Sequence, residues 1–116
     1  MKLPRDADAR IERDKIVNYL LDTAHPDGGP KAEFFLSFGF TRARWRLLER
    51  AIRGQVQEHE VIRVVESVYG TRYIIDGEIN APDGRTPRIR TVWIIEADNA
   101  ELGGPDAPRL ITAHPI

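Results

Sequence analysis

Residues 24–40 read AHPDGGPKAEFFLSFGF, and they combine a turn with the start of a helix. Pro26 fixes its own φ at a value typical of turns and pushes His25 out of the helical region. The Asp-Gly-Gly sequence that follows is predicted to supply the positive φ angles of a turn. Pro30 suits the first position of a new helix, and Gly39 is expected to end that helix. This stretch therefore predicts the boundary between two helices.

Apolar spacing predicts one helix before this stretch and another after it. Residues 14–22 place apolar side chains at i, i+3 and i+4, which is the spacing of one helix face. Residues 42–53 repeat the pattern, with Thr41 as the candidate N-cap and Gly54 as the expected end. Residues 55–60 are polar and are expected to link the helices to the second half of the chain.

After residue 60 the apolar period changes to two, which predicts strands. Turn-forming Gly, Pro, Asn and Asp residues separate these strands. The predicted strands are residues 61–69, 72–79, 88–97 and 109–114, and residues 98–108 are expected to form the longest loop. Helices followed by hairpin-linked strands indicate an α+β fold, in which about three N-terminal helices precede a four-stranded antiparallel sheet.

The composition indicates one globular domain. A chain of 116 residues with 41% hydrophobic residues can bury one core, so we expect a single domain over residues 1–116, with residues 1–10 as an irregular arm. The absence of cysteine excludes disulfides and thiolate chemistry. The N-terminus lacks the apolar region of a signal peptide, and no apolar run approaches the ~20 residues of a membrane span. We therefore expect a cytoplasmic protein with no membrane partner.

The charge pattern is mixed. A formal net charge of −1 argues against a protein that coats nucleic acid by bulk charge. Scattered histidines without carboxylates at ligand spacing predict no metal site, and the absence of nucleotide-binding motifs predicts no cofactor. Arg42, Arg46 and Arg53 share a stripe on the third predicted helix. This stripe indicates either a solvated face or a surface that contacts RNA or a partner.

Arg90 lies in the middle of the third predicted strand, residues 88–97, which carries apolar residues on both faces and is therefore expected to be central. A charge in this position needs a partner, because an unpaired buried charge is very costly. One interpretation is an ion pair with Asp76, Glu66 or Glu78. The other is that Arg90 binds a phosphate on the open face of the sheet.

Several side chains have the chemistry of metal-free RNA cleavage, which requires an acid, a base and a cationic group. His25 and His114 carry imidazole groups, which commonly serve as general acids or bases, although each also suits an exposed structural position. Lys31 follows two glycines at a helix start, where it is either an exposed lysine or part of an anion site. Tyr73 is either a core aromatic or a residue that stacks on a base. The candidate site residues are His25, Lys31, Tyr73, Arg90, Thr112 and His114.

Four segments resemble an uncharacterised bacterial domain family. They read KIVNYLLD, AHPDGGPKAEFFLSFGF, YGTRYIIDGEINAPDGRTPRIRTVWII and PRLITAHPI. Members of this family stand alone, often encoded beside a small partner protein, or form the C-terminal ends of polymorphic toxins. The HP-x-G-x-x-KA-x-FF segment and the RTVWI strand are the most specific parts of the resemblance. The order of helices and strands is also similar to that of the barnase, EndoU, colicin and RelE group of metal-independent RNase toxins.

The resemblance implies RNA as the substrate and a small cognate antitoxin or immunity protein as a partner. It implies roles for His25 with Lys31, Arg90 with Thr91, Thr112 with His114, and Tyr73. We therefore predict a toxin-like, metal-independent ribonuclease that cleaves RNA phosphodiesters. The alternatives are a non-catalytic domain that binds a cognate protein and a purely structural domain. The ribonuclease interpretation requires the turn in residues 24–40 to bring His25 and Lys31 to the edge of the sheet, near Arg90.

Overall fold

The computed structural model describes residues 1–97 and 107–116, and it confirms an α+β fold with N-terminal helices before a four-stranded antiparallel sheet. A short 3-10 turn, Asp6–Asp8, precedes α1 (Arg13–Lys15), which continues into a π-helical turn, Ile16–Leu20. The later elements are α2 (Gly29–Ser37), α3 (Trp45–Glu58), β1 (Val61–Ser67), β2 (Gly70–Glu78), β3 (Arg88–Glu96) and β4 (Arg109–Pro115). The strands lie in the order β1-β2-β3-β4.

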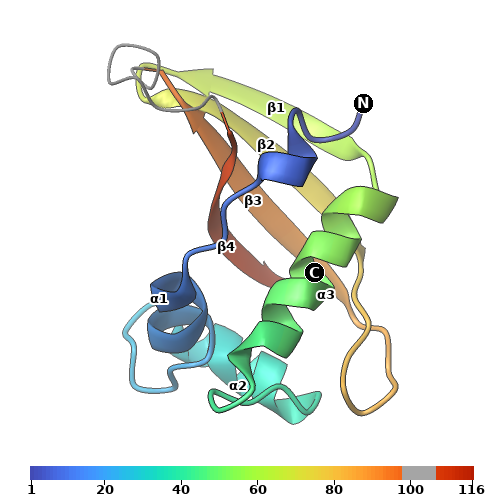
Figure 1. The fold of residues 1–116 in the computed structure, drawn as a ribbon. Helices are drawn as coiled ribbons and strands as arrows, with labels where there is room; N and C mark the ends of the chain where they lie inside the picture. Colours follow the sequence, from blue (N-terminus) through green and yellow to red (C-terminus); the bar gives the residue numbers. More distant parts are fainter. Residues whose placement is uncertain (98–106) are drawn as a thin grey trace.

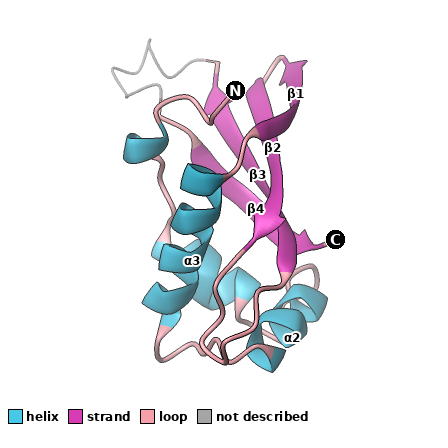
Figure 2. Cartoon of the chain, turned by 90° about the vertical axis from the view of Figure 1, so that its right-hand side faces the viewer, coloured by secondary structure: helices cyan, strands magenta, loops and turns pink. Residues whose placement is uncertain are grey.

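The helices cover one face and one end of the sheet. Figures 1 and 2 show α3 running along one face, whereas α1 and α2 gather at the end where β4 finishes. The predicted apolar stripes explain this arrangement, because Ile16, Leu20, Phe35, Leu48 and Ile52 are all completely buried. No helix in residues 1–97 or 107–116 has the length and apolar character needed to cross a bilayer.

The helix α3 is longer than the sequence predicts. Gly54 was the expected end, and residues 55–60 were the expected link, but the helix continues to Glu58. Its last turns bury Gln55 and Val56 against the sheet. This tertiary burial outweighs the low helix propensity of glycine, which costs about 1 kcal/mol relative to alanine. The prediction of the helix end at Gly54 was therefore wrong.

A buried polar network joins α3 to the two central strands. The Gln55 Nε2 donates hydrogen bonds to the carbonyl oxygens of Ile75 at 3.0 Å and Ile89 at 3.1 Å. Its Oε1 accepts a bond from the Thr91 hydroxyl at 2.8 Å, and that hydroxyl accepts one from Trp93 Nε1 at 2.9 Å. Every polar atom of these side chains that can bond in the core thus has a partner, as buried polar groups require.

The first ten residues pack against the core and the edge of the sheet. Leu3 and Ala9 are buried. The Arg10 amide donates to the Pro108 carbonyl at 2.8 Å, and the Leu110 amide donates to the Arg10 carbonyl at 3.0 Å. The segment therefore covers the start of β4, which is an edge strand. The loop expected over residues 98–108 lies almost wholly outside the described residues.

Candidate functional site

Tyr19 lies at the centre of a polar cluster where the first helix, the turn after it and β4 meet. The Lys31 Nζ donates a hydrogen bond to the Tyr19 hydroxyl at 2.6 Å, and this hydroxyl shares a second bond with Thr112 Oγ1 at 3.1 Å. The Lys15 Nζ lies 4.8 Å from the centre of the Tyr19 ring. The His25 ring packs edge-on against it, with 4.9 Å between ring centroids. We call these five residues the Tyr19 cluster.

The cluster changes the acidity of the Tyr19 phenol. Burial by itself raises the pKa of Tyr19, but the hydrogen bonds from Lys31 and Thr112 and the positive charges of Lys31 and Lys15 act in the opposite direction. Their combined effect lowers the pKa below the usual value of 10.0. A phenol in this environment gives up its proton more readily than a solvated one.

Two glycines allow the turn to press against Tyr19. A Cβ atom on Gly28 would overlap the Tyr19 carbonyl oxygen, and one on Gly29 would lie 2.8 Å from the Thr23 carbonyl oxygen. Gly28 has a φ of −85°, so the predicted positive φ angles are not the reason for glycine here. That prediction was wrong for this turn, although Gly39 at the end of α2 does have a φ of +96°. Space, rather than backbone conformation, requires glycine at the turn.

His25 closes this turn with one of its ring nitrogens. Its Nδ1 accepts hydrogen bonds from the backbone amides of Asp27 at 3.0 Å and Gly28 at 2.9 Å. Two amide donors require a lone pair on Nδ1, so the ring proton of neutral His25 lies on Nε2. The side chain can therefore offer an N–H group to a ligand, but it has no free lone pair with which to accept a proton.

Arg90 and His114 lie on the face of the sheet opposite the core, which we call the outer face. The register places Asp76, Arg90 and His114 side by side on β2, β3 and β4. The Arg90 Nε and Nη2 donate to the two Asp76 carboxylate oxygens at 2.7 Å and 2.9 Å. The ion-pair interpretation of Arg90 is therefore confirmed, with Asp76 as the partner.

This ion pair shifts the pKa values of Asp76 and Arg90 in opposite directions. The hydrogen bond from Arg90 outweighs the effect of burial and, with the nearby charges of Arg90, Arg88 and His114, lowers the pKa of Asp76. The same pairing raises the pKa of Arg90. On the other side of Arg90, His114 Nδ1 lies 3.0 Å from the Pro115 carbonyl oxygen. When Nδ1–H donates this bond, Nε2 keeps a free lone pair.

Thr112 of the Tyr19 cluster and His114 of the Asp76–Arg90–His114 row lie on the outer face, two residues apart on β4. Thr112 faces Val92 and His114 faces Arg90, so the two β4 side chains point to the same side. Residues two apart on a strand are about 7 Å apart. Lys31 is connected to β4 through the Tyr19 hydroxyl, which bonds to Thr112, and His25 contacts the Tyr19 ring.

Two residues of the predicted set lie elsewhere. Tyr73 pairs with Trp93, which is fully buried, so Tyr73 lies on the helix-covered face and packs against the core. Thr91 is also fully buried, and its hydroxyl is engaged by Gln55 and Trp93. Strand parity explains both positions, because adjacent residues of a strand point to opposite faces.

The sequence did not predict Tyr19 and Lys15 as site residues. Helical spacing assigned Tyr19 to the buried stripe with Ile16 and Leu20, and that assignment describes only its ring. The hydroxyl extends past the core to Thr112, 93 positions along the chain. The available signal was a tyrosine at the margin of the stripe with a lysine on the neighbouring turn.

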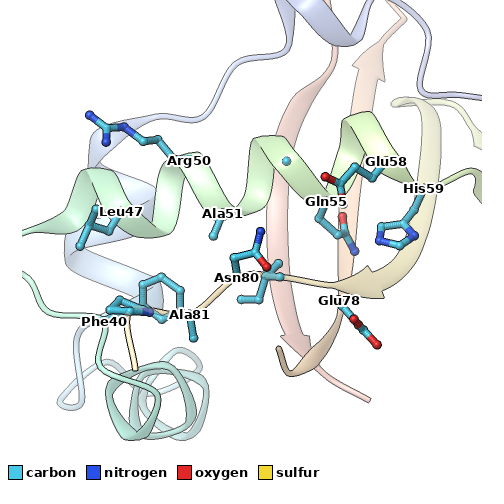
Figure 3. A pocket seen from close by; sticks show the side chains of 13 residues that line it. Phe40, Leu47, Arg50, Ala51, Gln55, Glu58, His59, Glu78, Asn80 and Ala81 are labelled. Carbon is cyan, nitrogen blue, oxygen red and sulfur yellow. The ribbon is translucent and has the colours of Figure 1, made fainter. Parts of the chain in front are cut away.

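A separate cleft of about 360 Å³ lies between α3 and the segment that follows β2 (Figure 3). We call it the α3 cleft. Apolar and polar side chains both line it. The apolar ones include Phe40, Leu47, Ala51, Ile79 and Ala81, and the polar ones include Arg50, Glu58, His59, Glu78 and Asn80. Within residues 1–97 and 107–116, no group of three His, Asp or Glu side chains is arranged to hold a metal ion.

Comparison with known proteins identifies a family and a fold. The sequence pattern described as Domain of unknown function (DUF6883) matches residues 2–116. Among solved structures, a chain of a contact-dependent growth inhibition toxin–immunity protein complex from Klebsiella pneumoniae 342 is similar, with a TM-score of 0.71 and 14% sequence identity over 95% of each chain. At this identity the likeness shows a shared fold. No protein with a curated description matches the chain.

Proposed function

We propose that this chain, which belongs to the DUF6883 domain family, is a toxin-like domain that cleaves RNA without a metal ion. The observation that carries the proposal is the 2.6 Å bond between Lys31 and a Tyr19 phenol of lowered pKa, which also bonds to Thr112, two residues before His114 on β4. An acidified phenol, an imidazole with a free nitrogen and fixed cations form the set that phosphodiester cleavage requires. The fold shared with a chain of a toxin–immunity complex agrees with this proposal but does not carry it.

The proposed reaction is an attack of the ribose 2′-oxygen on the adjacent phosphorus. The free Nε2 of His114 takes the proton from the 2′-hydroxyl as the new O–P bond forms. The bond from phosphorus to the 5′-oxygen breaks, and Tyr19 donates its phenolic proton to that leaving oxygen. Lys31 stabilises the phenolate through its N–H donor. The products are a 2′,3′-cyclic phosphate and a free 5′-hydroxyl, after which solvent returns the proton from His114 to Tyr19.

Two further donors would hold the phosphate. Arg90 uses Nε and Nη2 for Asp76, which leaves Nη1 available to a phosphate oxygen. His25 offers its Nε2–H, while its Nδ1 stays engaged by the turn. In this proposal His25 is a phosphate donor instead of the general acid or base, because proton acceptance at Nδ1 would displace two amide bonds.

The outer face supports RNA as the substrate. The register places Arg63, Arg72 and Arg88 on this face, alongside the half-buried Ile74 and Val92. The three arginines are exposed and form no ion pair with a described residue. A local basic surface attracts a polyphosphate backbone even where the net charge of the whole chain is −1.

The test is cleavage of end-labelled RNA by the purified chain in the presence of EDTA. We expect fragments that end in a 2′,3′-cyclic phosphate, and no cleavage where the reacting ribose lacks its 2′-hydroxyl. Tyr19→Phe and His114→Ala should each lower the rate by about 100-fold or more, the typical effect of a general acid or base. Tyr69→Phe is the matched control, because Tyr69 is 74% exposed at the β1–β2 turn. Intact RNA with the folded wild-type chain would contradict the proposal.

A non-catalytic domain that binds a cognate protein is the second candidate. One observation favours it: Ile62, Val64, Val68 and Tyr69 expose apolar surface on the edge strand β1 and the turn after it, with Val68 85% exposed. Exposed apolar surface of this kind is common at protein interaction sites. If RNA stays intact while Val64→Asp abolishes binding of the cognate protein, this function replaces the ribonuclease.

A further inference from the structure

We propose that single-stranded RNA lies across the outer face with a fixed polarity, and that Arg63 and Arg72 hold the phosphates on the 3′ side of the cleaved bond. The inference rests on the proposed ribonuclease function and deepens it. It names the direction in which the bound strand continues and the residues that hold it there.

A row of side chains crosses all four strands on the outer face. Its members, taken in order from β4 to β1 by the strand register, are Thr112, Val92, Ile74 and Arg63. We call it the Thr112–Arg63 row. Neighbouring strands are about 4.8 Å apart, so the row spans about 14 Å. Arg72 lies two residues before Ile74 on β2, and it therefore points to the same face beside the Arg63 end of the row.

The proposed catalytic roles give this row a direction. His114 takes the proton of the 2′-hydroxyl, and Tyr19 protonates the 5′-oxygen that leaves. The Tyr19 hydroxyl bonds to Thr112 at 3.1 Å, whereas His114 lies two residues farther along β4. The leaving 5′-oxygen is therefore placed at the Thr112 end of the row. The nucleoside that carries this oxygen lies 3′ to the cleaved bond, so the row extends from that nucleoside.

The far end of the row carries two arginines that have no carboxylate neighbour in the register. Ile74 lies opposite Arg63, and Val65 and Ile94 lie on either side of Arg72. Both arginines are exposed, and neither forms an ion pair with a described residue. Guanidinium groups in this setting favour an anion, and a phosphate matches their paired N–H donors.

The end of the outer face where β2 finishes is less favourable for further phosphates. Glu78 lies opposite Arg88 there, and Arg90 is bonded to both carboxylate oxygens of Asp76. A carboxylate beside each of these arginines offsets part of its positive charge. The charges therefore favour a strand that leaves the reacting phosphate toward Arg63 and Arg72 over one that leaves toward Glu78.

The middle of the row suits the face of a nucleobase. Ile74 and Val92 are half-buried, and their side chains contain no polar atom. A base reaches this surface only when it is unpaired and turned out of a helix, so the substrate is single-stranded. Neither side chain can hydrogen-bond to the edge of a base. We therefore expect little preference among the four bases at this position.

The first test compares two substrates that each contain one cleavable ribose among 2′-deoxynucleotides. One extends by two nucleotides on the 3′ side of the cleaved bond, and the other extends by two on the 5′ side. We expect kcat/KM to be about tenfold higher or more with the 3′ extension, because contacts to remote phosphates stabilise the transition state. The double variant Arg63→Gln/Arg72→Gln should remove this advantage.

The matched control is Arg44→Gln/Arg50→Gln, which removes the same charge from two exposed arginines at the start of α3 and within it. It should keep the advantage of the 3′ extension. Equal rates with the two substrates would overturn the inference and leave the ribonuclease function intact. Failure of the wild type to cleave either substrate or any other RNA would instead contradict the function itself.

The second test locates the bound strand without cleavage. The probe is a 2′-fluoro RNA tetranucleotide, which lacks the nucleophile, with a nitroxide label at its 3′ or its 5′ end. The 3′ label should broaden the NMR amide signals of residues 63 and 72, whereas the 5′ label should leave them sharp. In the double variant Arg63→Gln/Arg72→Gln, the slope of log affinity against log salt concentration should fall by about 0.7 for each lost phosphate contact. Equal broadening by both labels, or an unchanged slope, would overturn the inference.

Discussion

At the scale of single residues, Tyr19 connects the core to the candidate site. Its backbone and ring lie against Gly28, while its hydroxyl bonds to Lys31 and Thr112. One side chain therefore couples the first helix, the turn, α2 and β4. A change in the partners of the Tyr19 hydroxyl is expected to alter the acidity of the phenol more than the fold, because the core beneath it is formed mainly by other residues.

The first prediction concerns this acidity. Among the three tyrosines, Tyr19 should lose its proton at the lowest pH, because the bonds and charges around it lower its pKa. Lys31→Met should raise that pKa, since it removes both the 2.6 Å hydrogen bond and the positive charge. The measurement is the ultraviolet absorbance of tyrosinate, followed as the pH is raised into the alkaline range. Tyr19→Phe should delete the earliest step, and persistence of that step would assign it to another tyrosine.

The second prediction concerns the pair of Asp76 and Arg90. Arg90 lowers the pKa of Asp76 in the folded chain, so the pair stabilises the fold above the unfolded pKa of about 3.9 and loses this contribution as the pH falls through the folded pKa. Asp76→Asn should lower the free energy of unfolding at pH 7 by about 1–2 kcal/mol, because a hydrogen-bonded charge loses its partner.

Urea denaturation of wild type and Asp76→Asn at pH 7 and near pH 2.5 measures this effect. The difference between the two proteins should shrink at the acidic pH, because a fall in pH favours protonation of Asp76 and so weakens its pairing with Arg90. Asp8→Asn is the control, because Asp8 forms an exposed pair with Arg5 and such pairs contribute little. A difference that stays constant with pH would show that charge is not its cause.

At the scale of elements, two glycines have opposite roles. Gly28 lies in a turn that is pressed against Tyr19, so a Cβ atom there has no room. Gly54 lies inside α3 with no other atom within 4 Å of the position of a Cβ. The same substitution is therefore expected to act in opposite directions at the two positions.

The third prediction compares these substitutions by thermal or urea unfolding. Gly28→Ala should destabilise the chain by about 1–3 kcal/mol, the usual cost of forcing extra atoms into a packed site. Gly54→Ala should stabilise it by about 0.5–1 kcal/mol, because alanine has the higher helix propensity and restricts the unfolded chain. Destabilisation by Gly54→Ala would show that α3 does not continue through residue 54.

At the scale of the whole molecule, Gln55 joins the helical layer to the sheet. Its side chain bonds to β2, to β3 and to the Thr91 hydroxyl from a position that is 1% exposed. The fourth prediction is that Gln55→Leu lowers the free energy of unfolding by about 2–4 kcal/mol, since several buried bonds are lost and one hydroxyl loses its acceptor. Gln57→Leu, on the exposed side of the same helix, should change it by less than about 0.5 kcal/mol. Urea denaturation followed by tryptophan fluorescence measures both, and equal effects would contradict the role of Gln55.

Local pattern was sufficient to predict most elements of this fold. Alternating residues in RIRTVWIIEA predicted the central strand, and helical spacing predicted the burial of Ile16 and Leu20. The pattern failed at Gly54, where propensity predicted an end and the sheet supplied a reason to continue. It failed again at the turn, where glycine is required at position 28 because Tyr19 of the preceding helix leaves no room for a side chain.

The candidate site was only partly predictable. Lys31, Thr112 and His25 were chosen for their chemistry, and they meet only because Tyr19 lies between them. Tyr73 was chosen for the same kind of reason, but strand parity places it on the covered face. The sequence gives the chemistry of the side chain at each position. Which of these side chains come together depends on contacts between positions that are far apart in the chain.

The sequence by itself determined the order of helices and strands, the buried face of the helices and the need of Arg90 for a partner. These properties follow from periods of 3.6 and 2.0 residues and from the cost of a buried charge, and both act locally. The tertiary structure decided that the partner is Asp76, that α3 extends to Glu58 and that a tyrosine of the first helix meets a threonine of the last strand. Those outcomes depend on how the layers pack, because packing determines which atoms from distant parts of the sequence come within hydrogen-bond distance of each other.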